Sequence, residues 1–244
     1  MHSLTMISRD RALEEIPDSP ATVEFRQMAE DAELTAYRSG GGLLLANNEG
    51  RMLGAMGQVI AADAQSLLMQ PGFDGDLVAD EAAYERLCHA FPLERAIIQT
   101  LDGPWQRPNL PIPGPTIRSL ATEDSLDHLP EDLRAEIEYA RSRGRILAGF
   151  IDAHPVGFAY VVESAAHADM SIDTLEDYRN RGIATAVAAE MVDLVVAAGK
   201  RPVWGAVESN RASLRLAEKL GFRQPAGTLY VAEEPLRARH RDSF

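Results

Sequence analysis

Apolar residues in the second half of the chain recur with two different periods. Recurrence every three or four residues predicts helices that begin at Pro130, run over residues 183–198 and occupy residues 211–220. Short apolar runs bounded by turn residues predict strands at residues 116–121, 146–151, 156–162, 168–174, 202–207 and 229–232. The order β-α-β-β-β-α-β-α, with a last strand to follow, predicts a mixed sheet of the α/β or α+β class and excludes a helix bundle or a β-sandwich.

The pattern in the first half is weaker. Apolar spacing predicts helices over residues 24–37 and 78–91, and residues 95–100 predict a strand. Residues 43–46 and 51–60 predict a hairpin around Asn47-Asn48-Glu49-Gly50. The first half therefore also predicts an α/β arrangement.

One stretch of the first half resembles a stretch of the second. The segment GGLLLANNEGRMLGAMG has the same loose pattern of strand, turn and glycine-containing strand as GRILAGFIDAHPVGFAYV. A degenerate internal duplication is one interpretation of this pattern. The other is that small hairpins look alike without any relation between them.

Prolines separate the two halves. Five of the 14 prolines fall within the segment PWQRPNLPIPGP, at residues 104–115. Proline fixes φ and has no amide hydrogen, so this segment predicts an extended connector rather than a helix or a central strand. We expect an N-terminal α/β lobe at residues 1–103 and a C-terminal domain at residues 116–244.

Charge is distributed unevenly between these parts. The chain has 37 acidic and 24 basic residues, a net charge of −13. Residues 1–113 hold 17 acidic and 8 basic residues, so they account for −9 of that charge. Because binding to a nucleic-acid backbone requires clustered positive charge, we expect no nucleic-acid partner.

Cysteine content and hydropathy exclude further classes. The single cysteine, Cys88, excludes an internal disulfide and a multi-cysteine zinc site, and we expect no metal. The N-terminal segment lacks the apolar core of a signal peptide, and no uncharged apolar run approaches the ~18–20 residues that span a bilayer. We therefore expect a cytoplasmic protein with no membrane partner.

The segment Arg179-Asn180-Arg181-Gly182-Ile183-Ala184 lies between a predicted strand and a predicted helix. A helix N-terminus presents unpaired amide donors and the positive end of the helix dipole, which suits a pyrophosphate. Gly182 and Ala184 would let a large anion approach the backbone closely. Basic and glycine residues also begin many helices for structural reasons alone. The three-glycine fingerprint of dinucleotide sites is absent, so a dinucleotide ranks below other phosphate ligands.

A second motif follows one helix and one strand later. The string VESNRASLRLAEKLGF places Asn210 at a strand end, Ser213 one turn into a helix, and Gly221-Phe222 at the end of that helix. Together with RNRGIA it resembles the GNAT superfamily of acyl-CoA-dependent N-acyltransferases. The longer strings IDTLEDYRNRGIATA and RPVWGAVESNRASLRLAEKLGF are most similar to its zwittermicin-resistance-like branch. The resemblance covers residues 116–232, and the N-terminal lobe matches only as a degenerate GNAT-like partner.

The resemblance implies a site for acetyl-CoA. The loop amides would hold the pyrophosphate, and the preceding strand end would pair with the pantetheine arm, with an amide near Thr174 polarising the thioester carbonyl. Asn210 would bind the pantetheine and Ser213 would contact CoA, although Asn210 also suits a helix cap. The residues implied for acetyl-CoA are Ile172, Asp173, Thr174, Arg179, Asn180, Arg181, Gly182, Ile183, Ala184, Thr185, Asn210 and Ser213.

The catalytic positions depart from the pattern common in the family. Many relatives carry a general-acid tyrosine seven residues after the asparagine, and some carry a general-base glutamate five residues before it. In this chain these positions are Ala217 and Gly205. Neither side chain can transfer a proton, so another residue or a water must accept the proton that an ammonium substrate loses before attack.

Candidate bases lie on the strand that enters the loop. His167, Asp169, Ser171 and Asp173 alternate, so their side chains share one face of the strand. Asp169 and Asp173 are the candidate catalytic pair, able to attract an amine and to relay its proton through water. The alternative is an ordinary solvated face, and His167 is expected to be exposed at a turn.

These expectations combine into one function and one alternative. The function is N-acetyl transfer from acetyl-CoA to a primary amine of a small molecule, by direct attack on the thioester. The acidic first half favours a cationic acceptor, because opposite charge concentrates substrate near the site. The alternative, based on Ala217 and Gly205, is a non-catalytic CoA-binding or regulatory module. The sequence leaves open the acceptor, the acyl chain length and the oligomeric state.

Overall fold

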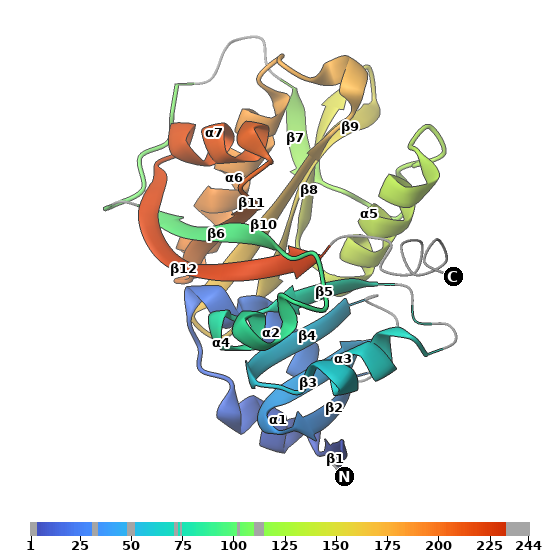
Figure 1. Cartoon of the computed structure of the whole chain (residues 1–244). Helices are drawn as coiled ribbons and strands as arrows, with labels where there is room; N and C mark the ends of the chain where they lie inside the picture. The colour runs from blue at the N-terminus through green and yellow to red at the C-terminus, as the bar shows by residue number, and fades with distance from the viewer. Residues whose placement is uncertain are drawn as a thin grey trace. The chain divides into compact units, whose positions relative to one another are not determined.

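The computed structural model describes residues 4–30, 34–47, 52–70, 73, 75–101, 103–109 and 115–232. The chain divides into two compact units (Figure 1). The first comprises residues up to Ile98 together with 205–210 and the residues from 225 onward. The second comprises residues 99–204 and 211–224. None of the helices within the described ranges is long and apolar enough to cross a membrane.

From residue 116 onward the chain follows the predicted order of elements. These are β7 (Thr116–Ser119), α5 (Glu131–Arg143), β8 (Ile146–Ile151), β9 (His154–Glu163), β10 (His167–Thr174), the 3-10 turn η2 (Glu176–Tyr178), α6 (Ile183–Ala197), β11 (Arg201–Val207), α7 (Arg211–Lys219) and β12 (Phe222–Ala232). Strands β7, β8, β9 and β10 pair antiparallel in this order, and β11 pairs with β10 in parallel. The mixed α/β fold is confirmed, and β12 is longer than predicted.

Local sequence sets the ends of these elements. Pro130 occupies the N-cap of α5, and Gly144 follows its last residue with φ 127°. The β8–β9 hairpin turns at Asp152 and Ala153, both at positive φ, 48° and 68°. Two successive positive φ values are characteristic of the tight two-residue turns that match strand twist. Gly199 lies just past α6 at φ 74°, which confirms the predicted helix end.

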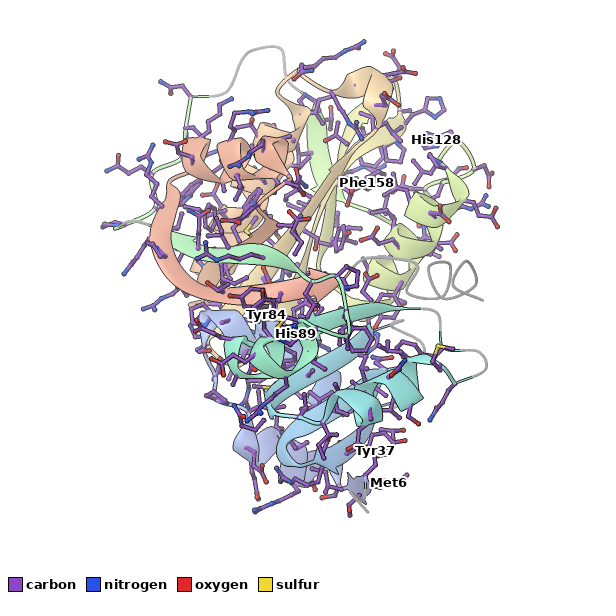
Figure 2. The ribbon with its side chains drawn as sticks, viewed as in Figure 1. Met6, Tyr37, Tyr84, His89, His128 and Phe158 are labelled. Carbon is purple, nitrogen blue, oxygen red and sulfur yellow. The ribbon has the colours of Figure 1, made fainter. Side chains whose placement is uncertain are left out.

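Helices cover both faces of the β7–β11 strands. Alternation along β9 places Phe158 (labelled in Figure 2) and Tyr160 on one face of the strand. Both residues pack in an apolar cluster with Ile137 of α5. The opposite face packs against α6. There Gly157 allows close contact, because a Cβ at this position would lie 2.5 Å from Cγ2 of Ile183. This contact sets the start of α6 directly against the sheet.

The first unit has its own strands and helices. These are β1 (Thr5–Ile7), α1 (Arg9–Glu15), the 3-10 turn η1 (Pro20–Thr22), α2 (Val23–Glu30), β2 (Leu34–Ser39), β3 (Gly41–Asn47), β4 (Met52–Gln58), α3 (Ala61–Leu68), β5 (Asp76–Ala79), α4 (Glu81–Leu87) and β6 (Glu94–Leu101), which ends in the second unit. Strands β1 to β4 pair antiparallel in sequence order, β5 joins β4 in parallel, and the end of β12 joins β5 antiparallel.

Two helix predictions in the first half are wrong in part. The helix predicted over 24–37 ends at Glu30, and β2 begins at Leu34, where Leu34 and Ala36 are buried in alternation with more exposed neighbours. The helix predicted over 78–91 begins as β5, a short run of mostly buried residues. The predicted hairpin 43–60 and the strand 95–100 are confirmed as β3–β4 and β6. Residues 48–50 of the hairpin turn and 110–114 of the connector lie outside the described residues.

The order of elements repeats between the halves. The series β2, β3, β4, α3, β5, α4, β6 matches the series β8, β9, β10, α6, β11, α7, β12, and in both the strands before and after the first helix pair in parallel. The repeated order agrees with a duplication, but it does not support the particular segments on which the sequence comparison was based. The two hairpins compared in the sequence are offset by one strand, because the topological equivalent of β8–β9 is β2–β3.

The contact of Gly157 with α6 yields a stability prediction. Gly157→Ala is expected to lower the free energy of unfolding by about 1–3 kcal/mol, because a well-packed site has no room for the added methyl. Gly41→Ala is the matched control, since an added Cβ there would lie 3.4 Å from Cβ of Gln58. Its effect is expected to stay within about 0.5 kcal/mol. Urea unfolding of both variants measures the difference, and equal effects would contradict the prediction.

Candidate functional site

Strands β10 and β11 begin as a parallel pair and then separate. Their pairing runs from His167 with Arg201 to Asp169 with Val203. Strand β10 meanwhile stays paired with β9 as far as Thr174. The end of β10 therefore has a strand partner on its β9 edge, while its other edge has parted from β11. An extended ligand can pair with such an edge as an added strand does.

Pairing with β9 fixes which backbone groups face the open edge. The amide of Leu175 donates to the carbonyl of Val156 at 3.0 Å. Successive amides of a strand point in alternate directions, so those of Ile172 and Thr174 point away from β9. The strand thus presents amide donors where the sequence predicts contact with a pantetheine arm and a thioester carbonyl.

The loop between β10 and α6 ends in an uncapped helix N-terminus. Asn180 and Gly182 adopt left-handed conformations, with φ 61° and 79°. The first amide to bond within α6 is that of Ala186, which donates to Gly182 at 3.0 Å. The amides of residues 183–185 therefore have no acceptor within the helix, and Gly182 provides no side-chain cap. This geometry suits an anion such as a pyrophosphate.

Three basic residues surround this helix start. Nε of Arg179 donates to the last carbonyl of β10 at 3.3 Å, and the Arg181 guanidinium lies 5.1 Å from the centre of the Tyr178 ring. Nζ of Lys219 donates to Oγ1 of Thr185 at 3.3 Å. The sequence analysis missed Lys219, because it is 34 residues from Thr185 along the chain and only the folded chain brings the two together.

The second motif lies at the start of α7. Asn210 is exposed directly before the helix, and its amide donates to the carbonyl of Val207 at 3.0 Å. Oγ of Ser213 accepts a hydrogen bond from the indole of Trp204 at 3.0 Å. Trp204 is 2% exposed and packs against Phe222, so it is a core residue that orients the Ser213 hydroxyl.

The two candidate catalytic aspartates lie on one face of β10 but not together. They are four positions apart, which is about 13 Å along a strand. Asp169 lies where β10 still pairs with β11, and its Oδ1 accepts from the amide of Met170 at 2.9 Å. Asp173 directly precedes Thr174 in the separated part of the strand. Only Asp173 is adjacent to the amides of the open edge.

Asp173 belongs to a hydrogen-bonded cluster on the α5 face. The hydroxyl of Tyr160, a buried residue of β9, lies 3.0 Å from Oδ2 of Asp173 and also hydrogen-bonds Oε1 of Glu136 on α5. Burial raises the pKa of Asp173, against the opposing effects of the Tyr160 hydrogen bond and the Arg179 charge. Burial, followed by the two nearby carboxyls, raises the pKa of Tyr160. The sequence analysis missed Tyr160, which lies within an apolar strand.

The other side chains able to react or to transfer a proton are buried, partly buried or ion-paired. His167 is 7% exposed, so the expectation of an exposed turn residue is wrong; the residue begins β10 and is covered there. Glu208 pairs with Arg95 at 3.0 Å, and Cys88 is half-buried at the end of α4. Ala217 is fully buried in α7. Within the described ranges, no group of three or more His, Cys, Asp or Glu side chains is placed to hold a metal ion.

The described part of the first unit lacks an equivalent anion site. Its connector from β4 to the helix α3 consists only of Val59 and Ile60. Asp80, the N-cap of α4, accepts from the amide of Gly57 at 3.0 and 3.1 Å and from that of Ala83 at 2.7 Å. A carboxylate thus binds the Gly57 amide at the end of β4, and its charge would repel a phosphate.

The open edge of β10 and the uncapped N-terminus of α6 together form a binding site suited to an extended ligand that carries an anionic group. Residues 157–228 match the sequence model of one family, GNAT acetyltransferase. The match includes β10, the loop, α6, β11 and α7, and this region of the chain has the GNAT fold.

Solved structures support the fold over nearly the whole chain. A protein described as a GNAT-family acetyltransferase, from Novosphingobium aromaticivorans, is 23% identical with a TM-score of 0.61, and the match covers 88% of this chain and 95% of that one. A GCN5-related N-acetyltransferase-like protein from Streptococcus suis is 19% identical with a TM-score of 0.63, covering 92% and 97%.

A tandem arrangement is also found among the similar structures. A tandem GNAT protein from the clavulanic acid biosynthesis pathway is 15% identical with a TM-score of 0.56, and the match covers 96% of this chain and 99% of that one. This likeness agrees with the repeated order of elements in the two halves. No protein with a curated description matches the chain.

The raised pKa of Asp173 gives a pH-dependent stability. Folding favours the protonated carboxyl, so this contribution is present below the ordinary pKa of an aspartate and is lost as pH rises through the raised pKa. Asp173→Asn cannot ionise, so its stability relative to the parent protein is expected to increase as pH rises above about 4, the ordinary pKa of an aspartate. Urea unfolding at a series of pH values measures this difference. A difference that is constant or decreases with pH would contradict the assignment.

Proposed function

We propose that this protein is an acyl-CoA-dependent N-acetyltransferase that acetylates a primary amine of a small molecule by direct attack on the thioester. The observation that carries the proposal is the separation of β10 from β11, which leaves the amides of Ile172 and Thr174 on an open edge beside the start of α6. The family match over residues 157–228 supports acetyl-CoA as the acyl donor.

In this proposal the loop and the strand edge hold acetyl-CoA. The amides of residues 179–185 bind the pyrophosphate, and Arg179, Arg181 and Lys219 contribute positive charge. The edge from Ile172 to Thr174 pairs with the pantetheine arm, and the Thr174 amide polarises the thioester carbonyl. Ser213, in the first turn of α7, contacts CoA.

Of the two candidate carboxyls, we assign the proton transfer to Asp173. It directly precedes Thr174, whose amide would hold the reacting carbonyl, whereas Asp169 is about 13 Å away along the strand. Burial raises the pKa of Asp173 above that of an ordinary aspartate, which moves the carboxyl toward the range in which a group both accepts and releases a proton. Asp169 would add negative charge that attracts an ammonium substrate.

The charge of the chain favours a cationic acceptor. The net charge is −13, and residues 1–113 contribute −9 of it. Negative potential raises the local concentration of a cation and its rate of association. We place the protein in the zwittermicin-resistance-like branch on the strings IDTLEDYRNRGIATA and RPVWGAVESNRASLRLAEKLGF, and expect it in the cytoplasm.

Release of free thiol from acetyl-CoA tests the proposal. The protein is incubated with acetyl-CoA and with agmatine, spermidine, lysine, tyramine or glucosamine, and the thiol is measured with a chromogenic disulfide. Thiol release that depends on an amine, faster with the di- and polycations than with glucosamine, is expected. Binding of acetyl-CoA without release with any amine would instead support a non-catalytic CoA-binding module, for which Ala217 and Gly205 are the motivation.

Lys219 provides a test of the phosphate site. Lys219→Gln removes one charge beside the α6 N-terminus and is expected to weaken acetyl-CoA binding roughly 3- to 10-fold, as loss of one partly solvated charge contact does. Lys200→Gln is the matched control, since Lys200 pairs with Glu163 at 3.2 Å. Calorimetric titration with acetyl-CoA measures both affinities. Equal affinities for the two variants would remove Lys219 from the site.

A further inference from the structure

The Tyr160 hydroxyl lies between two carboxyl groups. It is 3.0 Å from Oδ2 of Asp173 on one side and hydrogen-bonded to Oε1 of Glu136 on the other. A tyrosine hydroxyl has one hydrogen to donate and lone pairs with which to accept. Both hydrogen bonds can therefore form at once only if one of the two carboxyls is protonated and donates to the tyrosine oxygen.

Burial decides which carboxyl holds that proton. Asp173 is half-buried at the sheet and burial raises its pKa, whereas Glu136 is exposed on α5. The cluster therefore forms a directed chain in which Asp173 donates to Tyr160 and Tyr160 donates to Glu136. Its inner end is adjacent to Thr174, and its outer end is in solvent.

We propose that Glu136, Tyr160 and Asp173 form a proton relay that carries the proton of the acceptor ammonium from the acyl-transfer site to solvent. The proposal rests on the acetyltransferase function proposed above. It assigns Tyr160 and Glu136 roles that neither the family match nor the site motifs include. Asp173 is the catalytic residue in this scheme, and the other two act through it.

Each proton in the proposed transfer has a donor and an acceptor. The ammonium gives a proton to Oδ1 of Asp173, the proton on Oδ2 moves to the Tyr160 oxygen, and the tyrosine proton moves to Glu136, which releases it to water. The neutral amine then attacks the thioester carbonyl, a C–N bond forms and the C–S bond breaks. The second amine proton ends on the CoA sulfur, so one ammonium and one thioester give one amide, one thiol and one released proton. Rotation of the tyrosine hydroxyl and the aspartic acid restores the chain.

The groups that act on Asp173 are Tyr160 on β9 and Arg179, which follows η2. Glu136 on α5 contacts Tyr160. The Arg179 charge opposes the effect of burial on Asp173. It therefore keeps the carboxyl from holding its proton too firmly to pass it on.

Tyr160→Phe removes the middle oxygen and keeps the ring. With the best amine of the panel, kcat is expected to fall on the order of 100-fold, at the lower end of the range of proton-transfer catalysis. The acetyl-CoA affinity is expected to stay within about twofold, since the ring still packs. The activity profile is expected to shift to higher pH, toward the pKa of the free amine, and added imidazole should restore part of the rate. A purely structural role of Tyr160 would produce neither the shift nor the rescue.

Glu136→Gln tests the outer end of the chain on an exposed helix position. Its kcat is expected to fall roughly 10-fold with a pH shift in the same direction, because the tyrosine proton then has no base to receive it. The matched control is Glu138→Gln, exposed on the same helix, with kcat within about twofold of the parent. Equal kcat values for the Glu136 and Glu138 variants would overturn the relay.

Infrared spectroscopy separates failure of the relay from failure of the proposed function. The free protein is expected to show the carbonyl stretch of a protonated carboxyl near neutral pH, absent in Asp173→Asn and shifted in Tyr160→Phe. A spectrum with no such stretch overturns the relay whatever the activity. Wild-type protein that shows the stretch but releases no thiol overturns the transferase function and, with it, the relay. Thiol release with normal kcat and pH profile in Tyr160→Phe overturns the relay alone.

Discussion

The parting of β10 from β11 is the constraint on which the rest of the site depends. A parallel pair that continued past Asp169 and Val203 would use the amides of the β10 edge in sheet bonds. Because the pair ends there, the strand offers an edge that ends beside the helix N-terminus, and one ligand can meet both. The close packing of Gly157 against Ile183 holds the helix start in this position.

The geometry of β10 separates its ligand-binding backbone amides from its acidic side chain. The amides of Ile172 and Thr174 lie in the plane of the sheet and point to the open edge, while the side chain of Asp173 projects from the face that α5 covers. The ligand edge can therefore stay accessible while the carboxyl between the two amides is partly shielded from water. This arrangement needs no tyrosine on α7, where Ala217 is buried.

The features that could be predicted from the sequence are those set by residues close together along the chain. Helices and strands of the second half follow from apolar periods bounded by Pro130, Gly144 and Gly199, and the loop from 179 to 185 is a single segment. The helix predicted over residues 24–37 was too long because β2 is short and begins soon after α2 ends. The buried residues Leu34 and Ala36 of β2 therefore fell within the apolar spacing of the preceding helix. Lys219 and Tyr160 could not be found in this way, since their contacts join residues that only the folded chain brings together.

Asp80 makes the end of β4 chemically different from the end of β10, its counterpart in the second half of the chain. Its carboxylate accepts from the amides of Gly57 and Ala83, so these backbone donors are bound by a side chain of their own unit. Substitution of Asp80 would leave the amides of Gly57 and Ala83 without this acceptor. The connector between β4 and α3 would still consist only of Val59 and Ile60. An anion site at this place in the first unit would therefore require both a longer connector and a different residue at position 80. For protein engineering, this means that no single substitution is enough to turn the first unit into a second binding site.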